Sequence, residues 1–200
     1  MRRFLVLLGA LAMTGSMVSP AHAAGEEAAR RFVEQITAKT LAVVQTDADA
    51  AAKQKELDAV FTPIVDIPFV GKFVLGQHWR TATPAQQKDY LAAYGPFLMK
   101  HYISRLVKYS GQSVEVTKAV AEKDSTLLVT MKIIESDSNS FFVEYRLRPA
   151  GNSFKLVDIV VEGVGLLTSQ RSEFNSVVNQ KGLDYLIEAL KKKTTSAGTA

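Results

Sequence analysis

The sequence predicts an α+β domain in which helices pack on a four-stranded antiparallel sheet. Three observations carry this prediction. Over residues 25–109, apolar side chains recur every three or four positions, which is the period of an α-helix. Over residues 113–161 they recur every second position, as in strands with one covered and one solvated face. From Thr168 onward the helical period returns, so helices flank the sheet in the chain.

Residues 1–23 have the pattern of a cleaved export signal and are excluded from the fold. Two arginines precede an apolar stretch over residues 4–18, and Ala21-His22-Ala23 matches the small-x-small cleavage pattern. The apolar stretch is shorter than the roughly 20 residues that a bilayer-spanning helix needs. We therefore expect cleavage and a periplasmic protein. Residues 24–192 would form a single domain and residues 193–200 a flexible tail.

The composition argues against several classes of function. The chain has no cysteine, which excludes disulfides, thiol catalysis and cysteine-ligated metals. Without Arg2 and Arg3, 22 of the 24 basic residues remain against 20 acidic ones, a mild balance that gives no argument for nucleic acid. His78 and His101 are the only histidines left after the signal, and neither has the spacing of a metal motif or a hydrolase motif nearby. We expect no metal site and no enzyme.

Four helical segments are predicted before the sheet. An amphipathic helix covers residues 25–46, and a second covers residues 50–61 before Pro63. The apolar stretch over residues 65–80 predicts a short helix or turn. Thr83-Pro84-Ala85-Gln86 is a capping box with proline at the first helical position, and it begins a long helix that ends at about Tyr109.

Gly95-Pro96 lies in the middle of this long helix, where proline removes a backbone hydrogen bond and should kink or split it. A curved helix can wrap a cavity, but a kink also suits a helix that follows an ordinary core, and both interpretations stay open. The side chains expected to face inward are Tyr90, Tyr94, Phe97, Leu98, Tyr102, Arg105 or Leu106, and Tyr109.

The four strands are predicted at residues 113–120, 126–134, 141–148 and 154–161. The breaks between them are turn-like and short enough for hairpins, so the sheet should be an antiparallel meander. Alternation places the following apolar side chains on its covered face: Val114, Val116, Leu127, Val129, Met131, Ile133, Phe141, Val143, Tyr145, Leu147, Val157, Ile159 and Val161.

The last strand turns sharply into a helix at residues 163–165, and two helices, over residues 168–179 and 183–192, complete the chain. Asp158 and Glu162 stand in this apolar strand, and buried carboxylates need partners. Arg171 is a candidate partner close in sequence. We interpret the three mainly as a structural polar cluster, with ligand contact as the alternative. The lysines at 191–193 suit a solvated helix end, although they could also contact anionic lipid head groups.

Two separated motifs resemble the MlaC family, also called the toluene-tolerance or periplasmic phospholipid-binding family. The first is Leu75-Gly76-x-x-Trp79-Arg80-x-Ala82-Thr83 with Gln86-Gln87, and the second is Asp158-x-x-Val161-Glu162-Gly163-Val164 with Gln170-Arg171-Ser172-Glu173-Phe174. The likeness covers the whole mature chain in element order. Asp66-Ile67-Pro68-Phe69-Val70 and His78-Trp79-Arg80 resemble the hopanoid-associated HpnM branch. The chain departs from the family pattern at two places. Gly165 stands where the family usually has Ser, and Gln170-Arg171 stands where Tyr-Arg is frequent in the family.

The resemblance implies a twisted sheet covered by helices, of the NTF2-like or MlaC-like kind, around an apolar pocket for acyl tails. It implies a carrier of diacyl phospholipid, with no other cofactor, between an outer-membrane lipoprotein complex and an inner-membrane MCE-domain protein of an ABC transporter. On this hypothesis the helical wall of the pocket is Phe69, Phe73, Trp79, Tyr94, Phe97, Leu98 and Tyr102. The sheet wall is Val129, Met131, Val143, Tyr145, Ile159 and Val161.

Three alternatives remain beside the phospholipid carrier. The first is a carrier of hopanoid or another polycyclic lipid, which needs a wider and shorter pocket. The second is an NTF2-like enzyme, for which Asp158 and His101 would have to serve as acid and base in the pocket. The third is an interaction protein with a filled core. Spacing alone favours an ordinary core, and the resemblance is what favours a pocket.

Overall fold

The structure, a computed structural model, describes residues 20–107, 113–135 and 139–195. The helices are α1 (Pro20–Val44), α2 (Ala50–Phe61), α3 (Ile67–Leu75), α4 (Gln77–Thr81), α5 (Pro84–Leu106), α6 (Leu166–Lys181) and α7 (Leu183–Thr195). The strands are β1 (Ser113–Ala121), β2 (Leu127–Ile134), β3 (Ser140–Ala150), β4 (Ser153–Val161) and β5 (Val164–Gly165), and a 3₁₀ turn covers Lys123–Ser125. The α+β class is confirmed.

Some predicted features fall on or beside the parts of the chain that the structure does not describe. Residues 1–19 of the predicted signal, the predicted helix end at Tyr109 and most of the turn before β3 lie outside the described residues. Helix α1 begins at Pro20, before the predicted cleavage point, and α7 runs three residues past its predicted end at Lys192.

Helix α5 begins where its sequence signal places it and continues through its proline. The Thr83 hydroxyl accepts a hydrogen bond from the Gln86 backbone N–H, and the Gln86 side chain accepts one from the Thr83 backbone N–H. Pro96 lies inside one continuous helix, so the predicted split does not occur. A Cβ added at Gly95 would come within 3.3 Å of the Ile67 side chain, so glycine lets α3 approach α5 closely.

The sheet is an antiparallel meander with the strand order β1-β2-β3-β4-β5, as predicted except for its fifth strand. After β4 the backbone reverses through Glu162 and Gly163, which have φ values of 48° and 78°. Positive φ at two consecutive residues is the geometry of a tight two-residue hairpin. Val164–Gly165 therefore pairs back onto β4 before α6 begins, two residues earlier than the predicted helix start.

A β-bulge in β4 changes which side chains reach the covered face of the sheet. Tyr145 pairs with Ile159, but Leu147 pairs with Leu156, so one extra residue is inserted opposite β3. Leu156 packs in the core beneath α1, whereas Val157 packs among the helices. Val157 is buried, but the alternating set missed Leu156, which is buried and pairs with Leu147, because alternation holds only while the pairing is regular.

Three clusters of buried side chains hold the fold together. The sheet core joins α1 to the sheet through Ala29, Val33, Val116, Leu127, Val129, Met131, Ile133, Leu147 and Leu156. A second cluster joins α1, α2 and α5 through Ile36, Val43, Val44, Leu57, Phe61 and Ile103. The helical core joins α3, α5, α6 and α7 through Val70, Val74, Leu75, Tyr90, Ala93, Tyr94, Phe97, Leu98, Val157, Leu167, Phe174, Leu186, Ile187 and Leu190.

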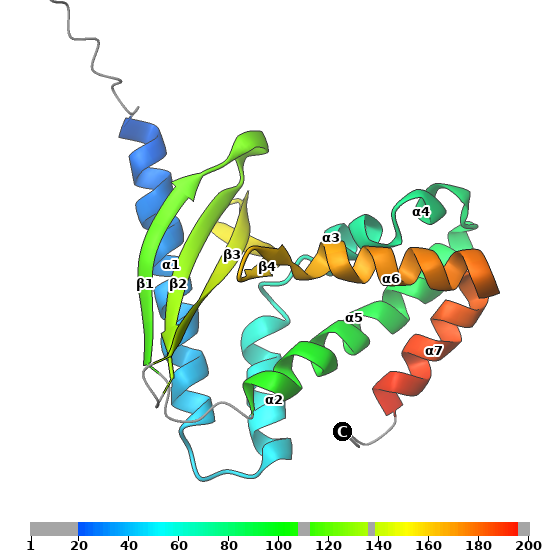
Figure 1. The fold of residues 1–200 in the computed structure, drawn as a ribbon, viewed down its shortest axis with the longest axis horizontal. Helices are drawn as coiled ribbons and strands as arrows, with labels where there is room; N and C mark the ends of the chain where they lie inside the picture. The colour runs from blue at the N-terminus through cyan, green and yellow to red at the C-terminus, as the bar shows by residue number, and fades with distance from the viewer. Residues whose placement is uncertain (1–19, 108–112, 136–138, 196–200) are drawn as a thin grey trace, which may run out of the picture.

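Figure 1 shows how these clusters are arranged in space. Helix α1 runs along the sheet at one side of the molecule, and α3, α4, α6 and α7 gather at the other side. Helices α2 and α5 lie between them, with α5 reaching from the helical side toward the sheet. The covered face of the sheet therefore meets α1 over one part and faces α5 over another.

Candidate binding cavity

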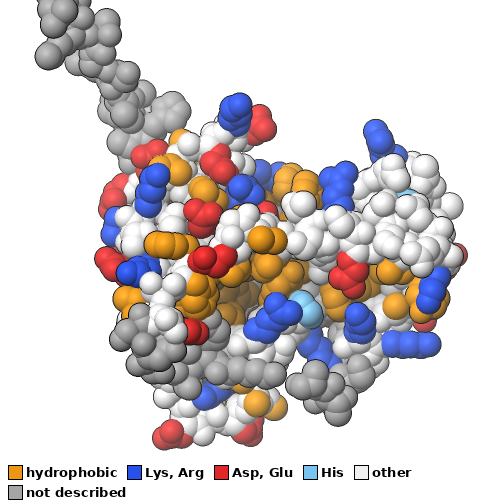
Figure 2. Space-filling view, in the orientation of Figure 1, with side chains coloured by type: hydrophobic (Ala, Val, Ile, Leu, Met, Phe, Trp, Pro, Cys, Tyr) orange, Lys and Arg blue, Asp and Glu red, His pale blue; other side chains and the backbone are white. Residues whose placement is uncertain are grey.

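A cavity of about 370 Å³ lies between the covered face of the sheet, the C-terminal half of α1 and the C-terminal half of α5. Figure 2 shows the corresponding hollow, bordered by hydrophobic side chains. Its sheet wall is Val114, Met131, Ile133, Phe141, Val143, Tyr145, Leu156, Val157, Asp158, Ile159 and Val161. Its opposite wall, formed by helices and by Val65 between α2 and α3, is Thr37, Thr40, Leu41, Val44, Phe61, Val65, Val70, Leu98, Met99, Tyr102, Ile103, Arg105, Leu106, Leu166 and Leu167.

The cavity exists because α1 covers only part of the sheet. Ala29 and Val33 in the first half of α1 are fully buried in the sheet core. Further along, Val43 and Val44 pack with α2 in the second cluster. The sheet between these two regions faces the last turns of α5 across open space, which no side chain fills.

Seven of the thirteen predicted wall residues line this cavity. They are Leu98 and Tyr102 from α5, Met131 from β2, Val143 and Tyr145 from β3, and Ile159 and Val161 from β4. The strand pairing brings the sheet members together, because Met131 pairs with Val143, Tyr145 with Ile159 and Val143 with Val161. Their contact with a ligand stays a prediction.

The other six predicted wall residues lie elsewhere. Tyr94 and Phe97 are buried in the helical core, Trp79 packs against that core, and Val129 is fully buried in the sheet core. Phe69 and Phe73 are 39% and 38% exposed on α3. The guanidinium carbons of Arg148 and Arg171 lie 4.5 and 5.1 Å from the ring centroids of Phe69 and Phe73. These six side chains therefore belong to filled cores or to the surface.

Sequence reasoning missed the contribution of α1 to the cavity. Thr37, Thr40, Leu41 and Val44 line it, and none was among the predicted wall residues. Leu41 is one of the apolar residues whose spacing predicted the helix. That spacing does not distinguish side chains that pack against another element from side chains that line a cavity. The threonines carry no apolar signal at all.

Asp158 is the anchor point of the turn between β4 and α6. Its Oδ1 accepts hydrogen bonds from the backbone N–H of Ile159 at 2.8 Å and of Leu167 at 3.3 Å. Its Oδ2 accepts one from Arg146 at 3.0 Å, and Arg146 also pairs with Glu122 at 2.7 Å. Burial raises the pKa of Asp158, while these hydrogen bonds and the Arg146 charge oppose that rise. Both carboxylate oxygens are thus committed to structure.

The predicted cluster of Asp158, Glu162 and Arg171 is not assembled. Glu162 accepts a hydrogen bond from the Phe142 backbone N–H at 2.6 Å, and Arg171 stacks on Phe73. The pairing of Asp158 with Arg171 was wrong because Arg146 approaches from the neighbouring strand, and cross-strand pairing cannot be read from closeness in sequence.

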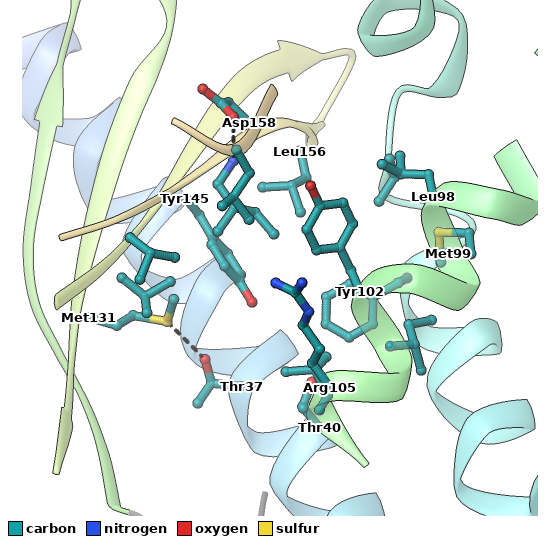
Figure 3. Close-up of a pocket in the computed structure, with 18 of the residues that line it drawn as sticks. Thr37, Thr40, Leu98, Met99, Tyr102, Arg105, Met131, Tyr145, Leu156 and Asp158 are labelled. Carbon is teal, nitrogen blue, oxygen red and sulfur yellow. Dashed lines mark hydrogen bonds between the residues drawn. The ribbon is translucent and has the colours of Figure 1, made fainter. Parts of the chain in front are cut away.

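Few polar groups interrupt the apolar lining. The Thr40 hydroxyl donates to the Ile36 carbonyl at 2.8 Å, within its own helix. The Thr37 hydroxyl lies 3.5 Å from the Met131 sulfur, across the cavity edge (Figure 3). Both hydroxyls therefore donate to protein atoms, and neither projects a donor into the open space.

Tyr102, Arg105 and Tyr145 are the polar side chains that turn toward the open space. In Figure 3 the Tyr145 hydroxyl and the Arg105 guanidinium point toward each other, with the Tyr102 ring beside them. Burial raises the pKa of Tyr145 to about 12, and burial also raises the pKa of Tyr102. Both phenols therefore stay protonated near neutral pH and act as hydrogen-bond donors.

The acid–base pair that an enzyme would need is not formed in the cavity. Asp158 lines the cavity, but its carboxylate oxygens are occupied as described. His101 is exposed, stacks on Phe97 with ring centroids 5.6 Å apart, and does not line the cavity. Within residues 20–107, 113–135 and 139–195, no three metal-ligating side chains come together, and no helix has the length and apolar character to cross a bilayer.

Comparison with known proteins gives a consistent set of matches. Residues 34–192 match the family described as MlaC protein. The chain is 26% identical over 129 residues to the toluene tolerance protein ttg2D of Pseudomonas putida, spanning 64% of this chain and 60% of that protein. It is 20% identical over 137 residues to the intermembrane phospholipid transport system binding protein MlaC of Haemophilus influenzae, spanning 66% and 64%. The chain thus spans less than two thirds of each relative's length.

A solved structure shares the fold. The phospholipid-binding protein of Ralstonia solanacearum, determined in complex with a phospholipid, superposes with a TM-score of 0.71 at 21% sequence identity. The superposition covers 83% of this chain and 96% of that chain. The arrangement of helices and sheet described above is therefore a fold found in a solved protein.

Proposed function

Because the chain belongs to the MlaC family, we propose that it is a periplasmic carrier that encloses the acyl tails of a phospholipid in the cavity between sheet, α1 and α5. The observation that carries this proposal is the cavity itself, about 370 Å³ with a lining that is apolar almost throughout. Its volume falls in the range of roughly 300–1,000 Å³ that small-molecule sites occupy.

The apolar lining matches the physical demand on a lipid carrier. Exposing apolar groups to water costs roughly 0.8 kcal/mol per CH₂, so two acyl tails of about thirty CH₂ groups together cost on the order of 20 kcal/mol. A carrier must therefore cover the tails almost completely. Met131, Val143, Ile159 and Val161 on the sheet and Leu98 on α5 offer that cover on both sides of the cavity.

The proposed partners follow from the family and from the names of its members. One relative is named as a binding protein of an intermembrane phospholipid transport system. We place this chain in the same role, receiving phospholipid from an outer-membrane lipoprotein complex or delivering it to one, and exchanging it with an inner-membrane MCE-domain protein of an ABC transporter. A hopanoid would use the same cavity, and the first experiment separates the two ligands.

That experiment is native mass spectrometry of the protein purified from the periplasm without detergent, followed by solvent extraction and lipid analysis. We expect phospholipid at near one molecule per chain. A hopanoid in its place would contradict the phospholipid assignment. A protein that is empty and takes up no lipid from vesicles would contradict the carrier function.

Two neighbouring residues of β3 provide a matched pair of variants. Val143 lines the cavity, whereas Phe142 is 47% exposed, and consecutive strand residues point to opposite faces. Val143→Arg places a charge among the acyl tails and should abolish lipid retention. Phe142→Arg places the same charge one residue away on the other face and should retain lipid. Circular dichroism confirms that both variants fold, and lipid retained by folded Val143→Arg would contradict the assigned wall.

A further inference from the structure

Arg105 is an unusual member of an apolar cavity lining. It lies in the last turn of α5, it is exposed to solvent, and its side chain is among those that border the cavity. In Figure 3 its guanidinium points into the open space between Tyr145 and Tyr102. A guanidinium at the edge of an apolar cavity can hold an anionic group there while the apolar part of the same ligand occupies the cavity.

The described part of the chain does not supply that anion. The ion pairs among described residues join other groups, and none includes Arg105. Asp158, the carboxylate that lines the same cavity, is engaged by Arg146 and by backbone N–H groups. A basic residue in the last turn of a helix is favourable by itself, but that accounts for the charge and not for its direction.

The other groups beside Arg105 are also donors. Tyr145 and Tyr102 carry protonated hydroxyls, and no described residue forms a hydrogen bond with either hydroxyl. The Tyr145 hydroxyl faces Arg105, whereas the Tyr102 hydroxyl is directed away from it, toward Leu156 (Figure 3). The guanidinium can only donate, and the Tyr145 hydroxyl that faces it can donate as well, so N–H and O–H donors converge at this point. Such a set matches a group that is negatively charged and rich in acceptor oxygens, because charge-assisted hydrogen bonds to phosphate or carboxylate are the stronger ones.

We propose that Arg105, with the Tyr145 hydroxyl opposite it, binds the phosphate of the lipid head group at the mouth of the cavity. This inference rests on the proposed function and narrows its ligand class. A phosphate diester supplies both the charge and the acceptor oxygens, whereas a neutral polycyclic lipid supplies neither. The carrier therefore selects lipids by their phosphate as well as by their tails.

The test compares two lipids that differ only in the phosphate-bearing head group. The lipid-free protein is incubated with vesicles that contain phosphatidylglycerol and diacylglycerol with identical acyl chains, and the bound lipids are quantified after re-isolation. The wild-type protein should prefer phosphatidylglycerol. Arg105→Gln should lower the bound ratio of phosphatidylglycerol to diacylglycerol about five-fold, the effect of one partly solvated charge-assisted contact. Tyr145→Phe should lower it by about two-fold.

Arg80→Gln is the matched control. Arg80 is exposed, lies in the last turn of α4, does not line the cavity and forms no ion pair with a described residue. The substitution Arg80→Gln removes the same charge from a similar helix position. The bound ratio of phosphatidylglycerol to diacylglycerol should therefore stay at the wild-type value. Equal losses in Arg80→Gln and Arg105→Gln would overturn the inference, since net charge would then explain the result.

The remaining outcomes separate this inference from the proposed function. If the wild-type protein takes up neither lipid, the carrier function itself fails. If it takes up both and Arg105→Gln keeps the wild-type ratio, only the head-group assignment fails. Calorimetry of lipid-free protein with inorganic phosphate tests the other source of the anion. Phosphate binding that depends on Arg105, together with an unchanged lipid ratio, would make this a site for free phosphate and overturn the proposal.

Discussion

The two halves of α5 lie in regions that are packed in opposite ways. In the first half, Tyr90 and Tyr94 are fully buried and stack on each other with ring centroids 5.4 Å apart. Their hydroxyls donate to the Gly71 carbonyl and to the Gln170 side chain. In the second half, Tyr102 and Leu106 border open space. One helix therefore contributes to a filled core at one end and to a cavity at the other.

The difference lies in what faces the helix and not in the helix itself. Helices α3, α6 and α7 pack around the first half of α5. The side chains of packed helices interdigitate, so little space is left between them. The second half faces a sheet that α1 only partly covers, so nothing fills the space between them. Several aromatic residues along one face of a helix thus indicate that this face is buried. Whether it borders a packed core or a cavity depends on the element opposite.

The sharpest test of this contrast removes one tyrosine from each region. Tyr94→Ala should lower the free energy of unfolding by about 3–5 kcal/mol, because it opens a cavity in a filled core and leaves the Gln170 side chain unpaired. Tyr145→Ala should cost about 2 kcal/mol or less, since one side of that ring already borders open space. Urea denaturation of lipid-free protein measures both values, and equal losses would mean that the cavity is closed in solution.

Much of the fold could be predicted from the sequence because its signals are local. The capping box at Thr83 and the break between the last two helices, at Gly182, each depend on neighbours in the chain, and both are found in the structure. The fifth strand was missed because it has only two residues, and the β4 bulge was missed because it depends on how two strands pair.

The cavity could be predicted only in part, for a physical reason. Alternation placed Met131, Val143 and Tyr145 on the covered face, and all three line the cavity. Helical spacing in turn placed Tyr94 and Phe97 on the inward face of α5, but both lie in the helical core. Periodicity reports the direction in which a side chain points, but the distance to the opposing element is a property of the assembled fold.

The second prediction enlarges one side chain in the helical core and one in the cavity, where the first removed a ring from each. Ala93→Leu in the helical core should destabilise the lipid-free protein by about 1–3 kcal/mol, because a filled core must distort to accept extra methyl groups. Val143→Leu in the cavity should leave stability unchanged or raise it by up to about 1 kcal/mol, since the added group buries apolar surface in open space. Denaturation curves compare the two variants, and a similar loss in both would remove the distinction between the regions.

The smallest expected effect concerns the tyrosine of the cavity at alkaline pH. Burial raises the pKa of Tyr145 to about 12 from an ordinary value of 10.0. A folded-state pKa above the unfolded one contributes stability that is present below pH 10 and is lost as pH rises toward about 12, because the unfolded chain releases the proton first. Near pH 10.5 the wild-type protein should therefore lose up to about 1 kcal/mol relative to Tyr145→Phe, compared with pH 7.

Tyr94 in the helical core also contributes to the alkaline loss of stability, because burial raises its pKa well above the ordinary value. The wild-type protein must therefore be compared with a variant that keeps Tyr94. Tyr94 titrates identically in the wild-type protein and in Tyr145→Phe, so the difference between their stability curves isolates Tyr145. Ultraviolet absorbance of tyrosinate gives an independent measurement of its pKa. If the two stability curves stay parallel, Tyr145 is as solvated as in the unfolded chain, and the cavity holds water in the lipid-free protein. A pKa that rises further when phospholipid is added would place the lipid against this side chain.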